Sequence, residues 1–150
     1  ARLINLELHV GGEWLGRVRA DGLIVATPTG SSAYSVSAGG PLVHPGVEAF
    51  SVTPVCPFLG GVRPMVLPAG ERLDVHILDS PAEMYLTLDG QECVSLCPGD
   101  VVAVRRAQRD VPFVHVDGES WAGTLRAKGF VTEPVPPGCG LGKSQSREEA

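Results

Sequence analysis

Short apolar runs recur along this chain, and turn-forming residues interrupt them so often that long helices are not expected. The 150 residues include 19 glycines and 13 prolines, and both residue types end regular helices. Runs of four to eight residues that are rich in aliphatic side chains and bounded by Gly, Pro or Asp are typical of β-strands. The sequence therefore predicts strands at 3–10, 14–20, 22–27, 49–55, 65–68, 72–78, 84–88, 101–107 and 112–116.

Turn signals between these runs indicate how the strands connect. The "GGE" segment at 11–13 predicts an opening β-hairpin, and "LDGQ" at 88–91 and "PGD" at 98–100 predict further hairpin turns. We expect a mainly β fold, a two-layer antiparallel β-sandwich, with one short helix after Thr29 and Gly39 at its C-terminal cap. This domain should cover residues 1–132, and the aperiodic Pro-, Gly- and charge-rich segment 133–150 should form a disordered tail.

Charge and hydropathy exclude several classes of protein. The net charge is −5, and the basic residues are scattered, so the electrostatic footprint of nucleic-acid or anionic-membrane binding is absent from the sequence. No run reaches the 18 or so apolar residues that span a bilayer, and the start lacks the pattern of a signal peptide. This pattern predicts a cytoplasmic protein and does not exclude an organelle. Because a strand pattern begins at once without an initiator Met, we expect the chain to be the later part of a longer polypeptide.

Cysteine and histidine spacings do not indicate a metal site. The chain contains four cysteines, at Cys56, Cys93, Cys97 and Cys139. Cys93 and Cys97 would lie about 13 Å apart on a strand, too far for a disulfide, and they lack the spacing of a zinc knuckle. We expect half-buried structural thiols. Three histidines fall in strand patterns without a companion at ligand spacing, namely His9, His76 and His115.

The stretch "DGLIVATPTGSSAYSVSAGGPLVHP", residues 21–45, carries the strongest sign of a binding site. A strand leads through Pro28 into a turn at Gly30, where a ligand can approach the backbone closely and a helix begins. Tyr34 offers a flat ring for stacking. Hydroxyl groups surround it at Thr27, Thr29, Ser31, Ser32, Ser35 and Ser37. Together they could hold a nucleotide; alternatively, Thr29 or Ser31 caps a short helix, which is worth about 1 kcal/mol, and Tyr34 is a core residue.

The same stretch does not match either of two catalytic motifs. No Lys follows the glycine, which excludes a phosphate-binding loop, and Tyr34 occupies the second glycine position of a nucleophile elbow. A serine hydrolase built from Ser31 or Ser32 with His44 and Asp89 is a weak alternative.

Two other polar residues of the stretch have structural alternatives. His44 is interpreted as a residue that shapes the turn before Pro45. Asp21, which precedes Gly22 and a buried strand, is either a turn residue or a hydrogen-bond acceptor for a ligand.

Five segments in fixed order carry a family resemblance. They are "ADGLIVATPTGSSAYSVSAGGPLVHP", "TPVCP", "RPMVLP", "LDGQ" and "GDVVAV". In this order they strongly resemble the C-terminal domain of NAD kinases over about residues 3–116. The resemblance implies an unusual β-sandwich that holds NAD, with the hydroxyls of the first segment around the adenosine and nicotinamide riboside parts.

The resemblance also implies which residues bind NAD. It places contacts at Asp21, Ser32, Ala33, Tyr34 and Ser37, with Thr29 and Gly30 shaping the pocket. Gln91 matches a position that reaches the ligand, and Arg19 and Cys56 match positions that line the site, often across a subunit boundary. Ser32 stands where the family usually has Thr, which keeps the hydroxyl and removes one methyl.

In the family, the γ-phosphoryl group of ATP moves to the 2′-hydroxyl of NAD's adenosine ribose to give NADP, with a divalent cation such as Mg²⁺ neutralising phosphate charge. The general base is the Asp of a Gly-Gly-Asp-Gly motif in a preceding N-terminal domain, and that motif does not occur in this sequence. We therefore expect an NAD-binding part that holds no catalytic residue or metal ligand and is inactive alone. Its partners would be NAD, ATP, the N-terminal domain and possible further copies in a homo-oligomer.

Two alternatives to the enzyme interpretation come from other functional classes. One is a non-catalytic NAD-sensing module. The other is a lipid kinase of the wider superfamily, which Tyr34 and the hydroxyl-rich segment disfavour because they suit a dinucleotide better than an acyl chain.

Overall fold

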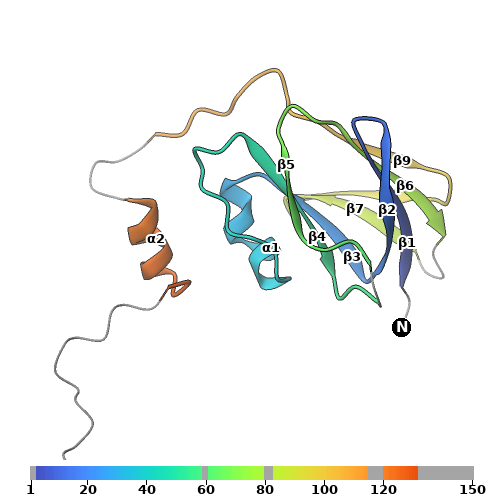
Figure 1. Cartoon of the computed structure of the whole chain (residues 1–150), viewed down its shortest axis with the longest axis horizontal. Coiled ribbons are helices and arrows are strands. Elements are labelled where there is room, and N and C mark those ends of the chain that lie inside the picture. The colour runs from blue at the N-terminus through green and yellow to red at the C-terminus, as the bar shows by residue number, and fades with distance from the viewer. Residues whose placement is uncertain (1–2, 59–60, 80–82, 115–119, 132–150) are drawn as a thin grey trace, which may run out of the picture. The chain divides into compact units, whose positions relative to one another are not determined.

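The computed structural model describes residues 3–58, 61–79, 83–114 and 120–131, and Figure 1 shows its strands and helices. The described elements are, in chain order, β1 (Ile4–Val10), β2 (Glu13–Ala20), β3 (Gly22–Ala26), the 3₁₀ helix η1 (Thr29–Ser32), α1 (Tyr34–Ser37), β4 (Ala49–Val55), β5 (Met65–Pro68), β6 (Leu73–Asp79), β7 (Met84–Leu88), β8 (Glu92–Leu96), β9 (Val101–Val104) and α2 (Trp121–Ala127). The mainly β fold expected from the sequence is confirmed.

All strand pairs in the described ranges are antiparallel. One sheet has the order β2-β1-β6-β9, a second has the order β3-β4-β5, and β7 and β8 form a separate hairpin. The two larger sheets pack through an apolar core, which is the predicted sandwich.

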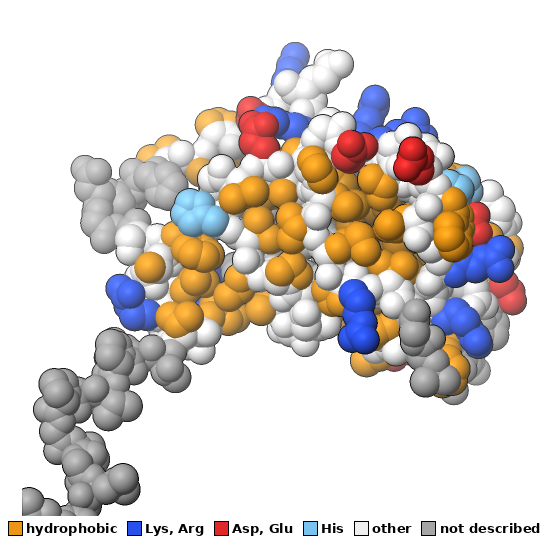
Figure 2. Space-filling model, in the orientation of Figure 1, with side chains coloured by type: hydrophobic (Ala, Val, Ile, Leu, Met, Phe, Trp, Pro, Cys, Tyr) orange, Lys and Arg blue, Asp and Glu red, His pale blue; other side chains and the backbone are white. Residues whose placement is uncertain are grey.

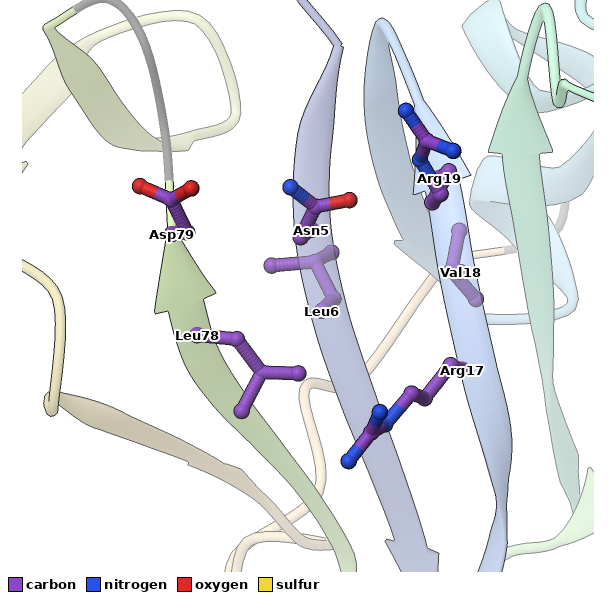
Figure 3. Close-up of a pocket in the computed structure, with 7 residues that line it drawn as sticks. All are labelled: Asn5, Leu6, Arg17, Val18, Arg19, Leu78 and Asp79. Atoms are coloured by element: carbon purple, nitrogen blue, oxygen red, sulfur yellow. The ribbon is translucent and has the colours of Figure 1, made fainter.

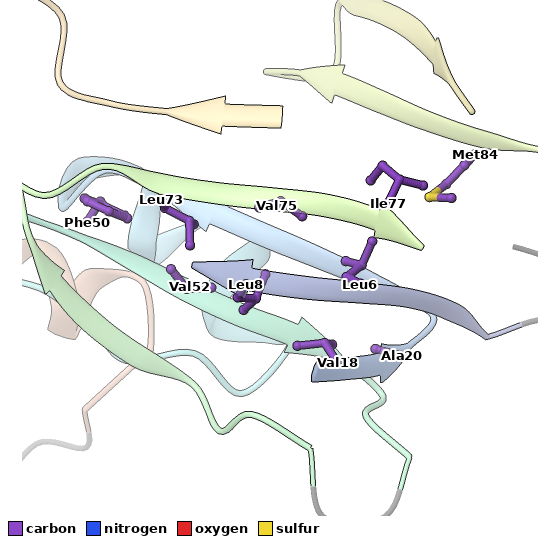
Figure 4. Packing of buried hydrophobic residues seen from close by; sticks show 10 residues of the cluster. All are labelled: Leu6, Leu8, Val18, Ala20, Phe50, Val52, Leu73, Val75, Ile77 and Met84. Carbon is purple, nitrogen blue, oxygen red and sulfur yellow. The ribbon is translucent and has the colours of Figure 1, made fainter. Parts of the chain in front are cut away.

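The core lies between the inward faces of these sheets (Figure 4). Leu8 and Val18 come from the first sheet and Val52 from the second, and all three side chains are fully buried. Burial of such a side chain stabilises the fold by about 1.5 to 3 kcal/mol. Met84 joins the same cluster and anchors the β7–β8 hairpin to it. Strand alternation sends one side of β2 and β6 to the core, whereas β4 is buried along almost its whole length.

Two hairpin turns have the left-handed backbone that two-residue loops require. Gly11 and Gly12 connect β1 to β2 with φ values of 58° and 86°. Asp89 and Gly90 are the central residues of the turn Leu88–Gln91, with φ values of 49° and 71°, and the Gln91 amide donates to the Leu88 carbonyl at 2.9 Å; β8 begins at the next residue, Glu92. Positive φ at both central residues is the type I′ geometry that Gly-Gly and Asp-Gly favour. Both predicted hairpins are confirmed.

The "PGD" segment is a turn, but the prediction that it closes a hairpin is wrong. Gly99 has φ 96°, and the Asp100 amide donates to the Cys97 carbonyl at 3.0 Å. However, β8 pairs with β7, whereas β9 pairs with β6. The turn therefore connects the β7–β8 hairpin to a strand of the first sheet. The pairing of β9 with β6 depends on long-range contacts, which the residues of the turn do not encode.

The C-terminal part differs from the expected strand pattern. The prediction of a strand at 112–116 is wrong for residues 112–114, which form no strand, and residues 115–116 lie outside the described ranges. Beyond them, α2 begins at an N-cap serine, Ser120, whose hydroxyl accepts from the Gly123 amide at 3.0 Å. This helix is additional to the predicted one.

The chain divides into two compact units, Ala1–Asp110 and Val111–Ala150. The first contains both larger sheets and the hairpin, and the second contains α2. The predicted boundary at residue 132 and the predicted disordered tail at 133–150 lie outside the described residues. Within the described ranges, none of the helices has the length and hydrophobicity that a membrane span requires.

Candidate functional site

The glycine- and hydroxyl-rich segment forms two helical turns after β3. Pro28 precedes η1, and Ala33 separates η1 from α1 because its φ of −100° and ψ of −124° are not helical. The predicted single helix is therefore broken at Ala33. The N-cap of η1 is Pro28, which makes no side-chain capping hydrogen bond, so the alternative that Thr29 or Ser31 caps this helix is wrong. The Thr27 hydroxyl, one residue earlier, accepts from the Gly30 amide at 3.1 Å.

Two serines of this segment point into the protein. Ser31 Oγ donates to the Pro28 carbonyl at 2.6 Å and accepts from the Val43 amide at 3.0 Å. Ser35 Oγ lies 3.1 Å from Thr53 Oγ1 on β4. Both serines are buried, although they lie on opposite sides of the break at Ala33. The pair therefore fixes the segment to the sheet and is not accessible to a ligand.

Two glycines let the chain leave α1 against β4. Gly39 has φ 84°, and its amide donates to the Val36 carbonyl at 3.0 Å, while the Gly40 amide donates to the Ser35 carbonyl at 2.9 Å. This is the Schellman pattern of helix ends, so the predicted C-terminal role of Gly39 is confirmed. A Cβ at Gly40 would clash with the hydroxyls of Ser35 and Thr53.

The opposite side of the segment faces outward. Tyr34 is 68% exposed, so the alternative that it is a core residue is wrong. Thr29, Ala33 and Ser37 are exposed as well, and Ser32 is half-buried. Anchored backbone and outward polar side chains together give a rigid surface with an aromatic ring at its centre. Preorganisation of this kind lowers the entropic cost of binding a ligand.

A second group of predicted residues lies where β2 and β4 end. The Asp21 amide donates to the Val55 carbonyl at 2.9 Å, and the Phe58 amide donates to the Arg19 carbonyl at 2.8 Å. These bonds place Arg19 and Asp21 alongside Cys56, whose φ of 46° is uncommon for a residue with a Cβ. All three predicted residues of this group are exposed.

Phe58 is a member of this group that the sequence argument missed. The Arg19 guanidinium lies over its ring, 5.4 Å from the centroid. Such a cation–π contact at an exposed site is worth about 0.5 to 1 kcal/mol, which favours this orientation of Arg19. The only signal in the sequence was an aromatic residue two positions after Cys56.

The two groups lie at opposite ends of β3. Asp21 immediately precedes Gly22 at the start of this strand, and η1 follows its last residue, Ala26. Four strand steps separate those ends by about 13 Å. Gln91 is in a third place, the tip of the β7–β8 hairpin, where it is exposed. The structure therefore brings the predicted residues together in two groups plus Gln91, and not around one pocket.

Charges around the first sheet are partly paired. A hydrogen bond from His9, 3.1 Å away, and then one from Arg17, 3.0 Å away, lower the pKa of the Glu7 carboxyl. His9 also lies beside His76 with ring centroids 4.7 Å apart, a companion that the sequence pattern did not reveal because it is on another strand. Among the described residues, no three His, Cys, Asp or Glu side chains are arranged to hold a metal ion.

Other sequence hypotheses are resolved by hydrogen bonds and exposure. His44 Nδ1 accepts from the Gly46 amide at 3.0 Å, as expected for a turn-shaping residue, and Ser31 is occupied by backbone partners. His44 Nδ1 and Ser31 Oγ are therefore not available for the alternative of a serine hydrolase triad. The expectation of half-buried thiols is wrong, because the free cysteines of the described ranges, Cys56, Cys93 and Cys97, are exposed. Cys139 lies outside those ranges.

Comparison with known proteins gives consistent matches. The ATP-NAD kinase C-terminal domain family matches residues 1–116. An NAD kinase from Oleidesulfovibrio alaskensis is 56% identical over 134 residues, which are 89% of this chain and 46% of that protein. The chain spans about half the length of the curated relatives it matches.

Two solved structures share the fold. A crystal structure of an NAD kinase from Archaeoglobus fulgidus in complex with ATP has a TM-score of 0.63 and 34% identity, over 72% of this chain and 41% of that one. Yeast NADH kinase complexed with NADH has a TM-score of 0.64 and 40% identity, over 69% of this chain and 30% of that one.

Proposed function

The chain belongs to the ATP-NAD kinase C-terminal domain family, and from that premise we propose that it is the NAD-binding part of an enzyme that phosphorylates NAD. The whole enzyme transfers the γ-phosphoryl group of ATP to the 2′-hydroxyl of the adenosine ribose, which gives NADP. The observation that carries the proposal is the outward surface of η1 and α1, where an exposed tyrosine stands among hydroxyls on an anchored backbone.

Each group of site residues has a role that its chemistry supports. The Tyr34 ring stacks on a flat part of NAD, and the hydroxyls of Thr29, Ser32 and Ser37 bond to its ribose and phosphate oxygens. Gly30 leaves room for the ligand beside the turn, and the exposed Ala33 borders the ring.

At the other end of β3, the Asp21 carboxylate accepts from ribose hydroxyls. Among the described residues it has no hydrogen-bond or ion-pair partner. Arg19 supplies positive charge, and Cys56 forms part of the wall. Gln91 reaches the ligand from the hairpin tip.

The separation of the two groups supports a site shared between two copies of the chain. A ligand pocket normally buries most of the surface of a small molecule, and each group alone is an exposed patch. Hydrophobic side chains also gather at the surface in the middle of the face shown in Figure 2. Exposed apolar surface of this kind favours contact with another protein surface.

We assign the remaining chemistry to the rest of the enzyme. In this proposal a divalent cation accompanies ATP, and the general base that deprotonates the 2′-hydroxyl comes from an N-terminal domain. Loss of a positioned general base lowers a rate by about 10²- to 10⁴-fold, so this chain alone should not form NADP. The domain described here contributes the binding and orientation of NAD.

The experiment is calorimetric titration with NAD of the wild-type chain and of Tyr34→Ala, Asp21→Ala and the control Tyr85→Ala. Tyr85 is also an exposed tyrosine, on β7, and its hydroxyl bonds to Glu83. We expect Tyr34→Ala and Asp21→Ala each to weaken binding about tenfold, as loss of one stacked base or one charged hydrogen bond does, while the control is unchanged. Unchanged affinity in both site variants would refute the assignment.

A second measurement separates the enzyme from a sensor. The whole protein is assayed for NADP formation with ATP, Mg²⁺ and NAD. NAD binding without NADP formation would refute the enzyme interpretation and favour the alternative, a non-catalytic NAD-binding module.

A further inference from the structure

The tip of the β1–β2 hairpin and the β5–β6 turn border a hollow of about 460 Å³, called here the hairpin-tip hollow. It is separate from the hollow drawn in Figure 3, which Arg19 lines and which therefore borders the candidate site. None of the described residues that line the hairpin-tip hollow belongs to the predicted NAD site. What this hollow binds is therefore a separate question from NAD binding.

Backbone hydrogen bonds fix both edges of the hairpin-tip hollow. The Gly11 amide donates to the Arg72 carbonyl at 2.9 Å, which ties the hairpin tip to the chain just before β6. The Glu71 amide donates to the Pro68 carbonyl at 3.0 Å, which closes the β5–β6 turn. A Cβ at Gly11 would lie 2.8 Å from Glu71 Oε2, so the Glu71 carboxylate lies directly against the hairpin tip. The two edges are therefore already joined in the absence of a ligand.

A β-bulge places an aromatic ring beside this hollow. The register of β2 with β1 shifts after Leu8, so Leu15 is the extra residue of β2. Neighbouring residues of a regular strand face opposite sides, whereas a bulge redirects side chains, and Trp14 and Leu15 both line the hollow. Trp14 is 62% exposed, so much of its indole ring is open to a ligand.

The polar groups of the hairpin-tip hollow are of one charge. Glu13 and Glu71 both line it, and among the described residues neither carboxylate has a hydrogen-bond or ion-pair partner. The described lining contains no Lys, Arg or His. The net charge of the chain, −5, has the same sign. The potential in this hollow therefore favours a cation and repels an anion.

The remaining lining limits which cation fits. Val10, Leu15 and Pro68 form an apolar wall, and methylene groups pack on such a wall while a charged end stays in water. An ammonium group is attracted both to a carboxylate and to the face of an indole ring. A hydrated metal ion would use neither the wall nor the ring. The lining therefore suits an alkyl chain that carries an ammonium group at each end.

We propose that the hairpin-tip hollow binds an alkyl diamine or polyamine, with ammonium groups at Glu13 and Glu71, one of them against the Trp14 ring. Exposed ion pairs and cation–π contacts are individually weak, so we expect a dissociation constant of about 1 mM. One stem joins both ends, so the second contact forms within the complex and a diamine binds more tightly than a monoamine. This binding goes beyond the proposed function and does not require NAD.

The test is a titration of the ¹⁵N-labelled chain with 1,4-diaminobutane, spermidine and the monoamine butylamine. Nuclear magnetic resonance follows the Trp14 indole N–H, which Trp14→Phe identifies against Trp121, and the Gly11 backbone amide, which every variant retains. We expect saturable shifts with the diamine and spermidine, and binding of butylamine that is weaker by about two- to fivefold.

Charge-removing variants locate the binding. Glu13→Gln and Glu71→Gln should each weaken diamine binding by about two- to fivefold, and the double variant by about tenfold, because each removes one exposed charge contact. Trp14→Leu should weaken it by about two- to fivefold. Glu92→Gln is the matched control, because it removes an exposed carboxylate of the β7–β8 hairpin, and it should bind the diamine like the wild type.

Four results would overturn the assignment. They are the absence of saturable shifts with both amines, equal affinity for butylamine and diaminobutane, an equal loss in Glu92→Gln, and the same shifts with MgCl₂ at matched ionic strength. A lysine-rich peptide that binds more tightly than spermidine, with the same losses in the variants, would replace the small amine by a basic protein partner. Glu13→Gln and Glu71→Gln should leave NAD affinity unchanged, so this result is independent of the Tyr34 and Asp21 titrations.

Discussion

Substitution of Gly40 by alanine tests whether close packing at the end of α1 holds the candidate site in place. The new Cβ would meet the hydroxyls of Ser35 and Thr53, and it would lie 2.8 Å from the Ser35 carbonyl oxygen. The neighbouring backbone is fixed by the hydrogen bonds that end α1, so it cannot yield without loss of those bonds. Either α1 moves away from β4 or the Ser35–Thr53 hydrogen bond breaks.

Two effects set the magnitude. Overpacking of a close contact costs about 1 to 3 kcal/mol. Loss of the buried hydrogen bond between Ser35 and Thr53 adds about 1 kcal/mol. We therefore expect Gly40→Ala to lower the free energy of unfolding by about 2 to 4 kcal/mol, a large share of the 5 to 15 kcal/mol typical of a domain.

Urea unfolding followed by far-ultraviolet circular dichroism measures this change. The control is Gly70→Ala, because no atom lies within 4 Å of a Cβ at Gly70 and its φ is not in the left-handed region. This variant should unfold like the wild type. Equal unfolding free energies for Gly40→Ala and Gly70→Ala would refute the argument that close approach of α1 to β4 requires glycine.

Three other predictions concern the core, a turn and pH. Leu8→Ala removes a fully buried side chain and should lower the unfolding free energy by about 2 to 5 kcal/mol in a urea titration. Gly90→Ala places a Cβ at φ 71° and should cost about 1 to 2 kcal/mol by the same assay, without steric contact. Glu7 has a lowered pKa in the folded state, first because of His9 and then because of Arg17. Its contribution to stability is therefore present above the ordinary value of 4.5 and lost as pH falls through the lowered pKa. Glu7→Gln should thus be less stable than wild type at pH 7 and closer to it at pH 3, and an equal difference at both pH values would contradict the assignment.

Local signals predicted most of the strands. The runs at 49–55, 65–68 and 84–88 coincide with β4, β5 and β7 because their ends are marked by Pro, Gly or charged residues. Turn chemistry was equally informative at Gly11–Gly12 and Asp89–Gly90, where left-handed backbone is needed. Pairing between distant strands was not encoded in this way. The sequence therefore indicated a turn at residues 98–100 but not that β9 pairs with β6.

The sequence indicated which residue types gather at the candidate site, but not the direction in which each side chain points. Seven hydroxyl or aromatic positions along 27–37 look equivalent in the sequence, yet Ser31 and Ser35 face inward while Tyr34 and Ser37 face outward. The helical repeat within η1 and within α1 determines which side chains face inward, and the non-helical backbone at Ala33 interrupts that repeat. The β-bulge at Leu78, where Asn5 pairs with Asp79 and Leu6 with Ile77, arises from pairing of two strands about 70 residues apart and has no local signature.

The arrangement around β3 connects this geometry to binding. In the proposed function, a short strand with a binding group at each end serves one ligand only if another surface covers the gap, because a dinucleotide needs enclosure that exposed side chains do not provide. The rigid anchoring of η1 and α1 by Ser31 and Ser35 then has a physical purpose. In that proposal the anchoring holds Tyr34 in place before the second surface binds, so the entropy of ordering the loop is lost during folding and not during binding.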